Sequence, residues 1–149
     1  CYIASSLGVT GWVRNNWDGK LTTVYRRNFS RYRLIDINND GIKELMLHNY
    51  PWAVFFTYYK GKVTPLIYGS TRGAYLKGQY LTIKTGTSSE NICRTYILQN
   101  GKVKQIINYF HTTSSAYPVP IYEVNGKRYS KTAFFKVYNK YMNNAKLLF

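Results

Sequence analysis

Three short turns of the same kind recur along the chain, each with a glycine followed by a lysine. They are Lys60-Gly61-Lys62, Asn100-Gly101-Lys102 and Asn125-Gly126-Lys127. Glycine adopts the positive φ of a tight hairpin turn without strain, and Asn-Gly matches the twist of paired antiparallel strands. The turns therefore predict three hairpins, which pair about residues 53–59 with 62–68, 94–99 with 102–109, and 120–124 with 127–129.

A fourth hairpin and two helices complete the expected fold. Tyr75-Leu76 and the run 80–83 are rich in β-forming residues and flank a turn at Lys77-Gly78-Gln79. From Lys131 to Leu148 the apolar residues fall at helical spacing, and the preceding Ser130 is placed as an N-cap. A short helix is also expected over about 20–29.

These elements predict an α+β fold of mainly antiparallel hairpins with a C-terminal amphipathic helix. No linker or low-complexity run divides the 149 residues, so the expectation is a single domain over 1–149, with an irregular segment at 1–19. Hydrophobic residues make up 45% and aromatic residues 17%, which excludes a disordered chain. No apolar run approaches the roughly 20 residues that span a bilayer.

The most informative motif is an acidic loop with the pattern DxNxDGxxE, flanked by apolar residues. Oxygen-bearing side chains stand at alternate positions, and Gly41 allows the sharp bend that turns them toward one point. Calcium requires six to eight oxygen ligands around such a point. The candidate ligands are Asp36, Asn38, Asp40, the backbone carbonyl of Ile42, and Glu44.

The loop departs from an EF-hand, and such a loop can also fold without a metal. Position 12 of the loop is Leu47 rather than Glu, which excludes a helix–loop–helix EF-hand and leaves strand–loop–strand or strand–loop–helix. Asx turns can also hold such a loop without any metal. Three of the six acids in the chain lie within nine positions, however, and a cation would relieve their repulsion. Arg31, Arg33 and Lys43 are the alternative counter-charges.

The chain is strongly basic, with 21 Lys and Arg against 6 Asp and Glu and a formal charge of +15. Such a field attracts polyanions, among them teichoic acid, glycosaminoglycans, anionic lipid and nucleic acid. The alternative is a solvated basic face, with the 16 tyrosines filling a β core. The candidate polyanion-binding residues are Arg26, Arg27, Arg31, Arg33, Lys102 and Lys104.

No catalytic constellation is recognisable, so the expectation is that the chain is not an enzyme. His48 and His111 are too few for a three-histidine zinc site and lack HExxH spacing. A lone cysteine at the start of a strand, such as Cys93, is typical of a buried and inert thiol. The acids outside the loop, which a glycosidase-like pair would need, are Asp18, Glu90 and Glu123.

The acidic loop and its surroundings resemble a known family. The segment from Tyr32 to Leu47 is similar to the "YALIDLDGDGxPELLL" segment of small secreted proteins and lipoproteins of Gram-positive bacteria (Firmicutes), mostly of unknown function. The hairpins at Tyr59 to Val63 and Tyr96 to Ile106, and the terminal segment from Tyr122 to Lys146, resemble family segments in the same order. The resemblance covers about residues 20–149.

The resemblance implies a secreted or cell-surface domain with a structural calcium-type loop. It carries over the five candidate ligands given above, although Asn38 replaces the usual second aspartate and the family is more often acidic than basic. Cys1 would be the lipid-modified first residue of a mature lipoprotein. The alternatives are that Cys1 is simply where this sequence starts, or that it pairs with Cys93.

Taken together, the sequence favours a secreted or surface-anchored binding module. Its partner would be a polyanionic envelope polymer, a host glycan or a protein. The alternatives are an accessory domain of a cell-wall hydrolase and a nucleic-acid-binding protein.

Overall fold

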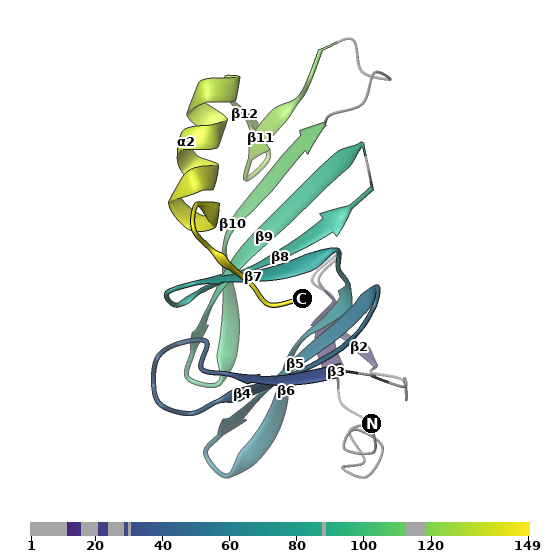
Figure 1. The fold of residues 1–149 in the computed structure, drawn as a ribbon, viewed down its shortest axis with the longest axis vertical. Helices are drawn as coiled ribbons and strands as arrows, with labels where there is room; N and C mark the ends of the chain where they lie inside the picture. Colours follow the sequence, from purple (N-terminus) through teal and green to yellow (C-terminus); the bar gives the residue numbers. More distant parts are fainter. Residues whose placement is uncertain (1–11, 16–20, 24–28, 30, 88, 113–118) are drawn as a thin grey trace. The chain divides into compact units, whose positions relative to one another are not determined.

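Two compact units make up the chain, Cys1–Thr71 with Leu98–Val103, and Arg72–Ile97 with Lys104–Phe149. The computed structural model describes residues 12–15, 21–23, 29, 31–87, 89–112 and 119–149 (Figure 1). Whether the two units belong to one domain, as the sequence predicts, stays a prediction. No helix in these ranges has the length and apolar character that crossing a membrane requires.

The first unit is built on a six-stranded sheet in the order β2-β1-β6-β5-β4-β3. Neighbouring strands run antiparallel except β1 and β6, which pair in parallel. The strands are β1 (Trp12–Asn15), β2 (Leu21–Thr23), β3 (Arg31–Ile35), β4 (Glu44–Asn49), β5 (Trp52–Tyr59) and β6 (Lys62–Ser70).

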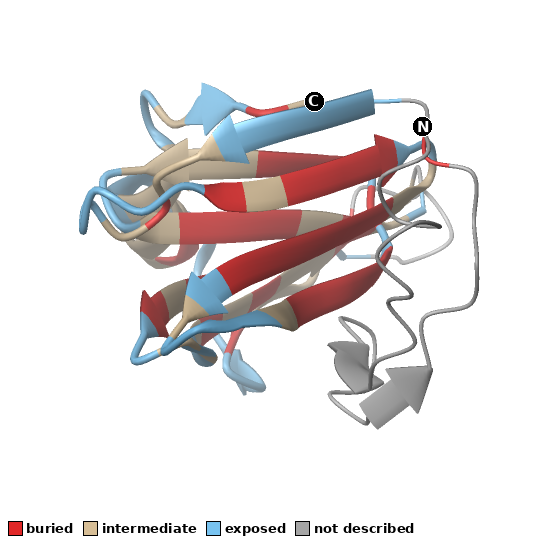
Figure 2. Cartoon of the chain, turned by 90° about the horizontal axis from the view of Figure 1, so that it is seen from below, coloured by how far each residue is buried: buried red, intermediate tan, exposed pale blue. Residues whose placement is uncertain are grey.

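One face of this sheet holds an apolar cluster. β5 supplies Val54 and Phe56 at alternate positions, because successive side chains of a strand point to opposite faces. Phe29 covers them, and Trp52 stacks on Tyr68 of β6 with ring centroids 5.5 Å apart. Buried residues are concentrated along the strands and exposed residues at their turns (Figure 2).

The second sheet has seven strands in the order β12-β11-β10-β9-β8-β7-β13. Its strands β8 and β9 bury Thr82 and Thr95, whose hydroxyl oxygens lie 2.8 Å apart. The strands are β7 (Gly73–Lys77), β8 (Tyr80–Gly86), β9 (Glu90–Gln99), β10 (Lys102–Thr112), β11 (Tyr122–Val124), β12 (Lys127–Arg128) and β13 (Lys146–Leu147).

All four predicted hairpins are confirmed. β5 and β6 pair out to Tyr59 and Lys62, so Lys60 and Gly61 form the turn, with φ of 50° and 77°. The Asn-Gly turns at Asn100 and Asn125 have positive φ as well. The mostly antiparallel strands with one C-terminal helix agree with the predicted α+β class.

The C-terminal helix α2 (Lys131–Met142) begins where the sequence predicts but ends earlier. The hydroxyl of Ser130 accepts a hydrogen bond from the backbone N–H of Ala133, as an N-cap does. The predicted extension to Leu148 is wrong. The C-cap Asn143 adopts an extended conformation with ψ of 126°, which ends the helix, and Asn144 follows with a φ of 59° before β13 pairs with β7.

The expected helix at 20–29 is also wrong in its described part. Leu21–Thr23 is strand β2, which pairs antiparallel with β1. Residues 24–28 lie outside the described residues, as does most of the irregular segment expected at 1–19. Local composition could not show this pairing, because it depends on a partner strand.

The core of the second unit is an aromatic cluster between α2 and one face of its sheet. Phe134 of α2 has no exposed surface. Its ring lies 6.1 Å from that of Tyr109 on β10 and 5.4 Å from that of Tyr122 on β11, between centroids. Tyr138, one helical turn further on, lies 5.4 Å from Tyr109. Edge and tilted contacts of this kind stabilise beyond the area that they bury.

Replacing Phe134 with Ala should therefore cost about 3–5 kcal/mol of unfolding free energy, through lost burial and the cavity left behind. Urea denaturation followed by near-UV circular dichroism measures this. Lys136→Ala, at an exposed position of the same helix, is the control and should change stability by less than about 0.5 kcal/mol. Equal effects of the two substitutions would contradict the packing described.

Candidate metal loop and basic surface

The acidic loop connects two paired strands. β3 and β4 form an antiparallel ladder in which Ile35 lies opposite Glu44, and residues 36–43 span the end of that hairpin. Of the two arrangements that the sequence allows, the structure therefore has strand–loop–strand.

Carboxylates within the loop accept hydrogen bonds from its own backbone. The two oxygens of Asp36 accept from the N–H groups of Asp40 and Gly41, at 3.1 and 3.0 Å. Asp40 accepts from the N–H of Ile42 and from the side-chain amide of Asn38, both at 2.8 Å. The bond from Ile42 to Asp40 is an Asx turn, and the four bonds together fold the loop tightly through its own side chains.

Two residues of the loop adopt the left-handed conformation, Asn39 with φ 59° and Gly41 with φ 84°. Asparagine tolerates this region and glycine occupies it without strain. A Cβ at Gly41 would meet no atom within 4 Å, so the backbone angle alone accounts for the glycine.

The amide oxygen of Asn38 has no donor. It is shielded from solvent and accepts no hydrogen bond among the described residues, although the amide nitrogen of the same side chain bonds to Asp40. A buried acceptor without a hydrogen-bond donor lowers the free energy of unfolding by about 1–3 kcal/mol. A cation or an ordered water at this oxygen would remove that cost.

The side chain of Glu44, the predicted last ligand, is buried beside strand β5. Its side chain is only 1% exposed, and its two carboxylate oxygens accept from the N–H of Ile37 at 2.9 Å and from the hydroxyl of Thr57 at 3.0 Å. Burial raises the pKa of this carboxyl group, against the two hydrogen bonds that lower it, and the nearby Asp40 charge raises it further. Glu44 thus ties the loop to β5.

Thr57 carries no motif that marks it as part of the site. It is a threonine in the apolar run of β5, and its partner is 13 residues earlier in the chain. A polar residue in a buried strand signals a buried polar partner, since an unsatisfied hydroxyl is costly. The sequence alone does not say that the partner is Glu44.

Four of the six predicted polyanion-binding residues lie on two described strands. Arg31 and Arg33 are exposed at alternate positions of β3, and so are Lys102 and Lys104 on β10. Alternate residues of a strand share a face, so each pair of cations is brought together. Arg26 and Arg27 lie outside the described residues.

The residues weighed for catalysis have ordinary structural settings. Cys93 is a free thiol, buried within the aromatic cluster, and burial raises its pKa to about 11. This disfavours the thiolate that a nucleophile needs. Burial, aided by Arg31 and Lys84 respectively, lowers the pKa of His48 and of His111.

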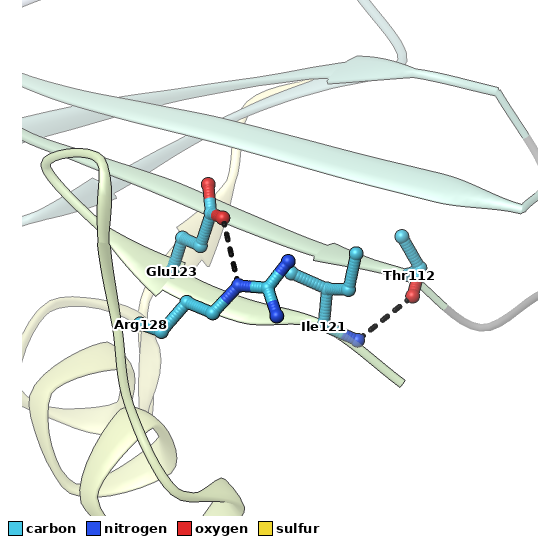
Figure 3. Close-up of polar contacts among 4 residues, drawn as sticks. All are labelled: Thr112, Ile121, Glu123 and Arg128. Atoms are coloured by element: carbon cyan, nitrogen blue, oxygen red, sulfur yellow. Dashed lines mark hydrogen bonds and ion pairs between the residues drawn. The ribbon is translucent and has the colours of Figure 1, made fainter. Parts of the chain in front are cut away.

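Of the acids outside the loop, Glu123 of β11 forms an ion pair with Arg128 of β12, with Oε1 and Nε 3.7 Å apart. It lies close to the bond by which Thr112 accepts the N–H of Ile121 (Figure 3). Asp18 lies outside the described residues. Across the described ranges, no group of three or more His, Cys, Asp or Glu side chains could hold a metal ion.

Comparisons of the chain with protein-family models, with curated proteins and with solved structures find no match.

The setting of Glu44 predicts a pH dependence of stability. A folded-state pKa above the ordinary value of 4.5 means that the folded protein holds this proton more tightly than the unfolded chain. The contribution of Glu44 to stability is therefore fully present below that ordinary value and falls as the pH rises through the folded value.

Glu44→Gln removes the titration but keeps an acceptor for one of the two donors. The unfolding free energy of the wild type relative to this variant should decline as the pH rises from about 4 to 8. Urea titrations of both proteins in chelator-containing buffer give the difference at each pH. A difference that is constant, or that grows with pH, would contradict the assignment.

Proposed function

We propose that this chain is a secreted or cell-surface binding module in which a calcium ion orders the loop 36–43 and a basic surface binds a polyanion. The buried, donor-free oxygen of Asn38 between two aspartates is the observation that carries the calcium site. The exposed arginines of β3, in a chain of charge +15, support the basic surface.

The residues present fit calcium. Asp36, Asn38 and Asp40 offer five side-chain oxygens within one tight loop, and each carboxylate oxygen that accepts one N–H retains a lone pair. The carbonyl of Ile42 and water would complete the six to eight oxygens that calcium prefers. The ion would supply positive charge that holds the loop together, and its role would be structural.

Glu44 enters this proposal as a support rather than as a direct ligand. Its side chain is buried and bonded to Thr57 of β5, and among the described residues Asp36, Asp40 and Glu44 do not form a group of three acids that could hold a metal ion. Its other donor is the backbone N–H of Ile37, next to Asp36. Its carboxylate would fix the start of the loop from the side of the sheet. The five-residue ligand set expected from the sequence thus reduces to Asp36, Asn38, Asp40 and Ile42.

An extracellular location accords with such a site. Two carboxylates and one amide give a low ligand charge, which is typical of sites with dissociation constants of about 10⁻⁴–10⁻³ M. Calcium reaches such concentrations outside cells. A lipid anchor at Cys1 stays a prediction, since this residue lies outside the described part of the chain.

Calcium should raise the melting temperature of the metal-free protein and release or absorb heat on titration, whereas Asp36→Asn should lose most of both effects. Asn38→Asp adds a charged ligand and should tighten binding. Asn39→Asp is the matched control, because it adds the same charge at an exposed position between the proposed ligands.

Calorimetric titration and thermal unfolding with calcium, and with magnesium for comparison, measure these effects. Absence of heat and of any thermal shift would overturn the site. Equal gains from Asn38→Asp and Asn39→Asp would show a response to charge alone and would also overturn it.

The proposed partner of the basic surface is a phosphate- or sulfate-bearing polymer such as teichoic acid or a host glycan. β3 presents Arg31 and Arg33 on one face and contains no acid. Calcium in the loop would add two charges close by, which would bring the formal charge to about +17 and strengthen the attraction.

Retention on immobilised teichoic acid and heparin should fall steeply between about 50 and 200 mM salt, since counterion release drives such binding. Arg31→Gln with Arg33→Gln should weaken retention more than Lys136→Gln with Lys146→Gln, which removes the same charge from the second unit. DNA and peptidoglycan are the comparison ligands. Salt-independent retention, or equal losses from the two double variants, would contradict the proposed surface.

A further inference from the structure

Among the described strands, β3 lies at an open edge of the first sheet. It is the last strand in the order of that sheet and pairs on one side with β4. Its side chains from Arg31 to Leu34 are all exposed, and Tyr32 and Leu34 keep 64% and 56% of their surface. Along an edge strand, alternate residues direct their N–H and C=O groups away from the sheet, where they can pair with another strand.

The other described edges are shorter. The second sheet ends in β12 and β13, each of two residues, and the far edge of the first sheet is β2, of three residues. Very short edge strands are a common protection against pairing with other chains. β3 has five residues and lacks that protection.

The two faces of this edge differ in chemistry. Arg31 and Arg33 lie opposite His48 and Met46 of β4, and so share one face of the ladder. Tyr32 and Leu34 lie opposite Leu47 and Leu45 and share the other face, which is apolar. An added strand would therefore meet two cations on one face and two large apolar side chains on the other.

We propose that the β3 edge binds an extended acidic segment of another protein by strand addition. Main-chain hydrogen bonds to β3 would supply affinity, carboxylates at alternate positions would face Arg31 and Arg33, and apolar residues between them would face Tyr32 and Leu34. The inference shares the two arginines with the proposed function and otherwise rests on the backbone of the edge.

The charges of the chain favour an acidic segment of another protein over a second copy of the chain. Pairing of β3 with β3 of a second copy would place arginines near arginines, in a complex of two chains of charge +15 each. Within these 149 residues no segment has the complementary pattern, because no two of the six acids stand two residues apart. The complementary strand thus belongs to a different, acidic protein.

The test uses a fluorescein-labelled synthetic peptide of alternating glutamate and valine, with capped ends, and its binding is followed by anisotropy. A second peptide of the same sequence carries N-methyl groups on alternate backbone amides, so it keeps the charge but cannot complete the ladder. A third has lysine in place of glutamate. Methylation should weaken binding by about tenfold or more, because the main-chain bonds are lost.

The double variant Arg31→Glu with Arg33→Glu should reverse the preference between peptides. It should lose binding of the glutamate peptide and gain binding of the lysine peptide. Lys136→Glu with Lys146→Glu is the matched control and should keep the original preference. Amide hydrogen exchange should slow at alternate residues of β3 when the glutamate peptide binds. Equal binding of the methylated peptide, no change in exchange, or an unchanged preference in the arginine variant would each overturn the proposal.

The outcome also separates this inference from the proposed function. A polyanion surface without strand addition would retain heparin and bind the plain and methylated peptides equally. Strand addition without a polyanion surface would discriminate between the two peptides and leave heparin unbound.

Discussion

The buried carboxylate of Glu44 is the interaction on which the geometry of the acidic loop depends. It begins β4, accepts from the backbone of Ile37 and from the hydroxyl of Thr57, and so joins two strands and a loop. An acid in an apolar setting is tolerated only where donors compensate its lost hydration. The bond from Ile37 to Glu44 also fixes the position of Asp36 and of the end of β3, because both directly precede Ile37 in the chain.

The hairpins could be predicted from the sequence because their turns are decided locally. Residues such as Lys60 and Asn125 adopt positive φ beside a glycine, whatever lies elsewhere in the chain. The limits of the helix and the nature of the N-terminal third depend on distant partners. Helical spacing continues past Met142, but β7 takes the following residues as β13. Leu21–Thr23 is a strand because β1 lies beside it.

The candidate site also has features that are decided locally and features that depend on distant residues. The oxygen-bearing residues at 36, 38 and 40 could be predicted because the loop is contiguous and its spacing is regular. The direction of Glu44 could not, because it depends on the register between β4 and β5, which brings Thr57 beside it. Nor does spacing reveal which face of β3 carries its arginines relative to the apolar cluster.

The division of the chain into two units has a spectroscopic consequence. No tryptophan stands among the residues of the second unit, which contains the packed rings of Tyr109, Tyr138 and Phe134. Indole fluorescence therefore reports on the first unit alone, including the stacking of Trp52 on Tyr68. The protein carries a natural optical label on the unit that holds the loop, so the order in which the two units melt is readable without any added dye.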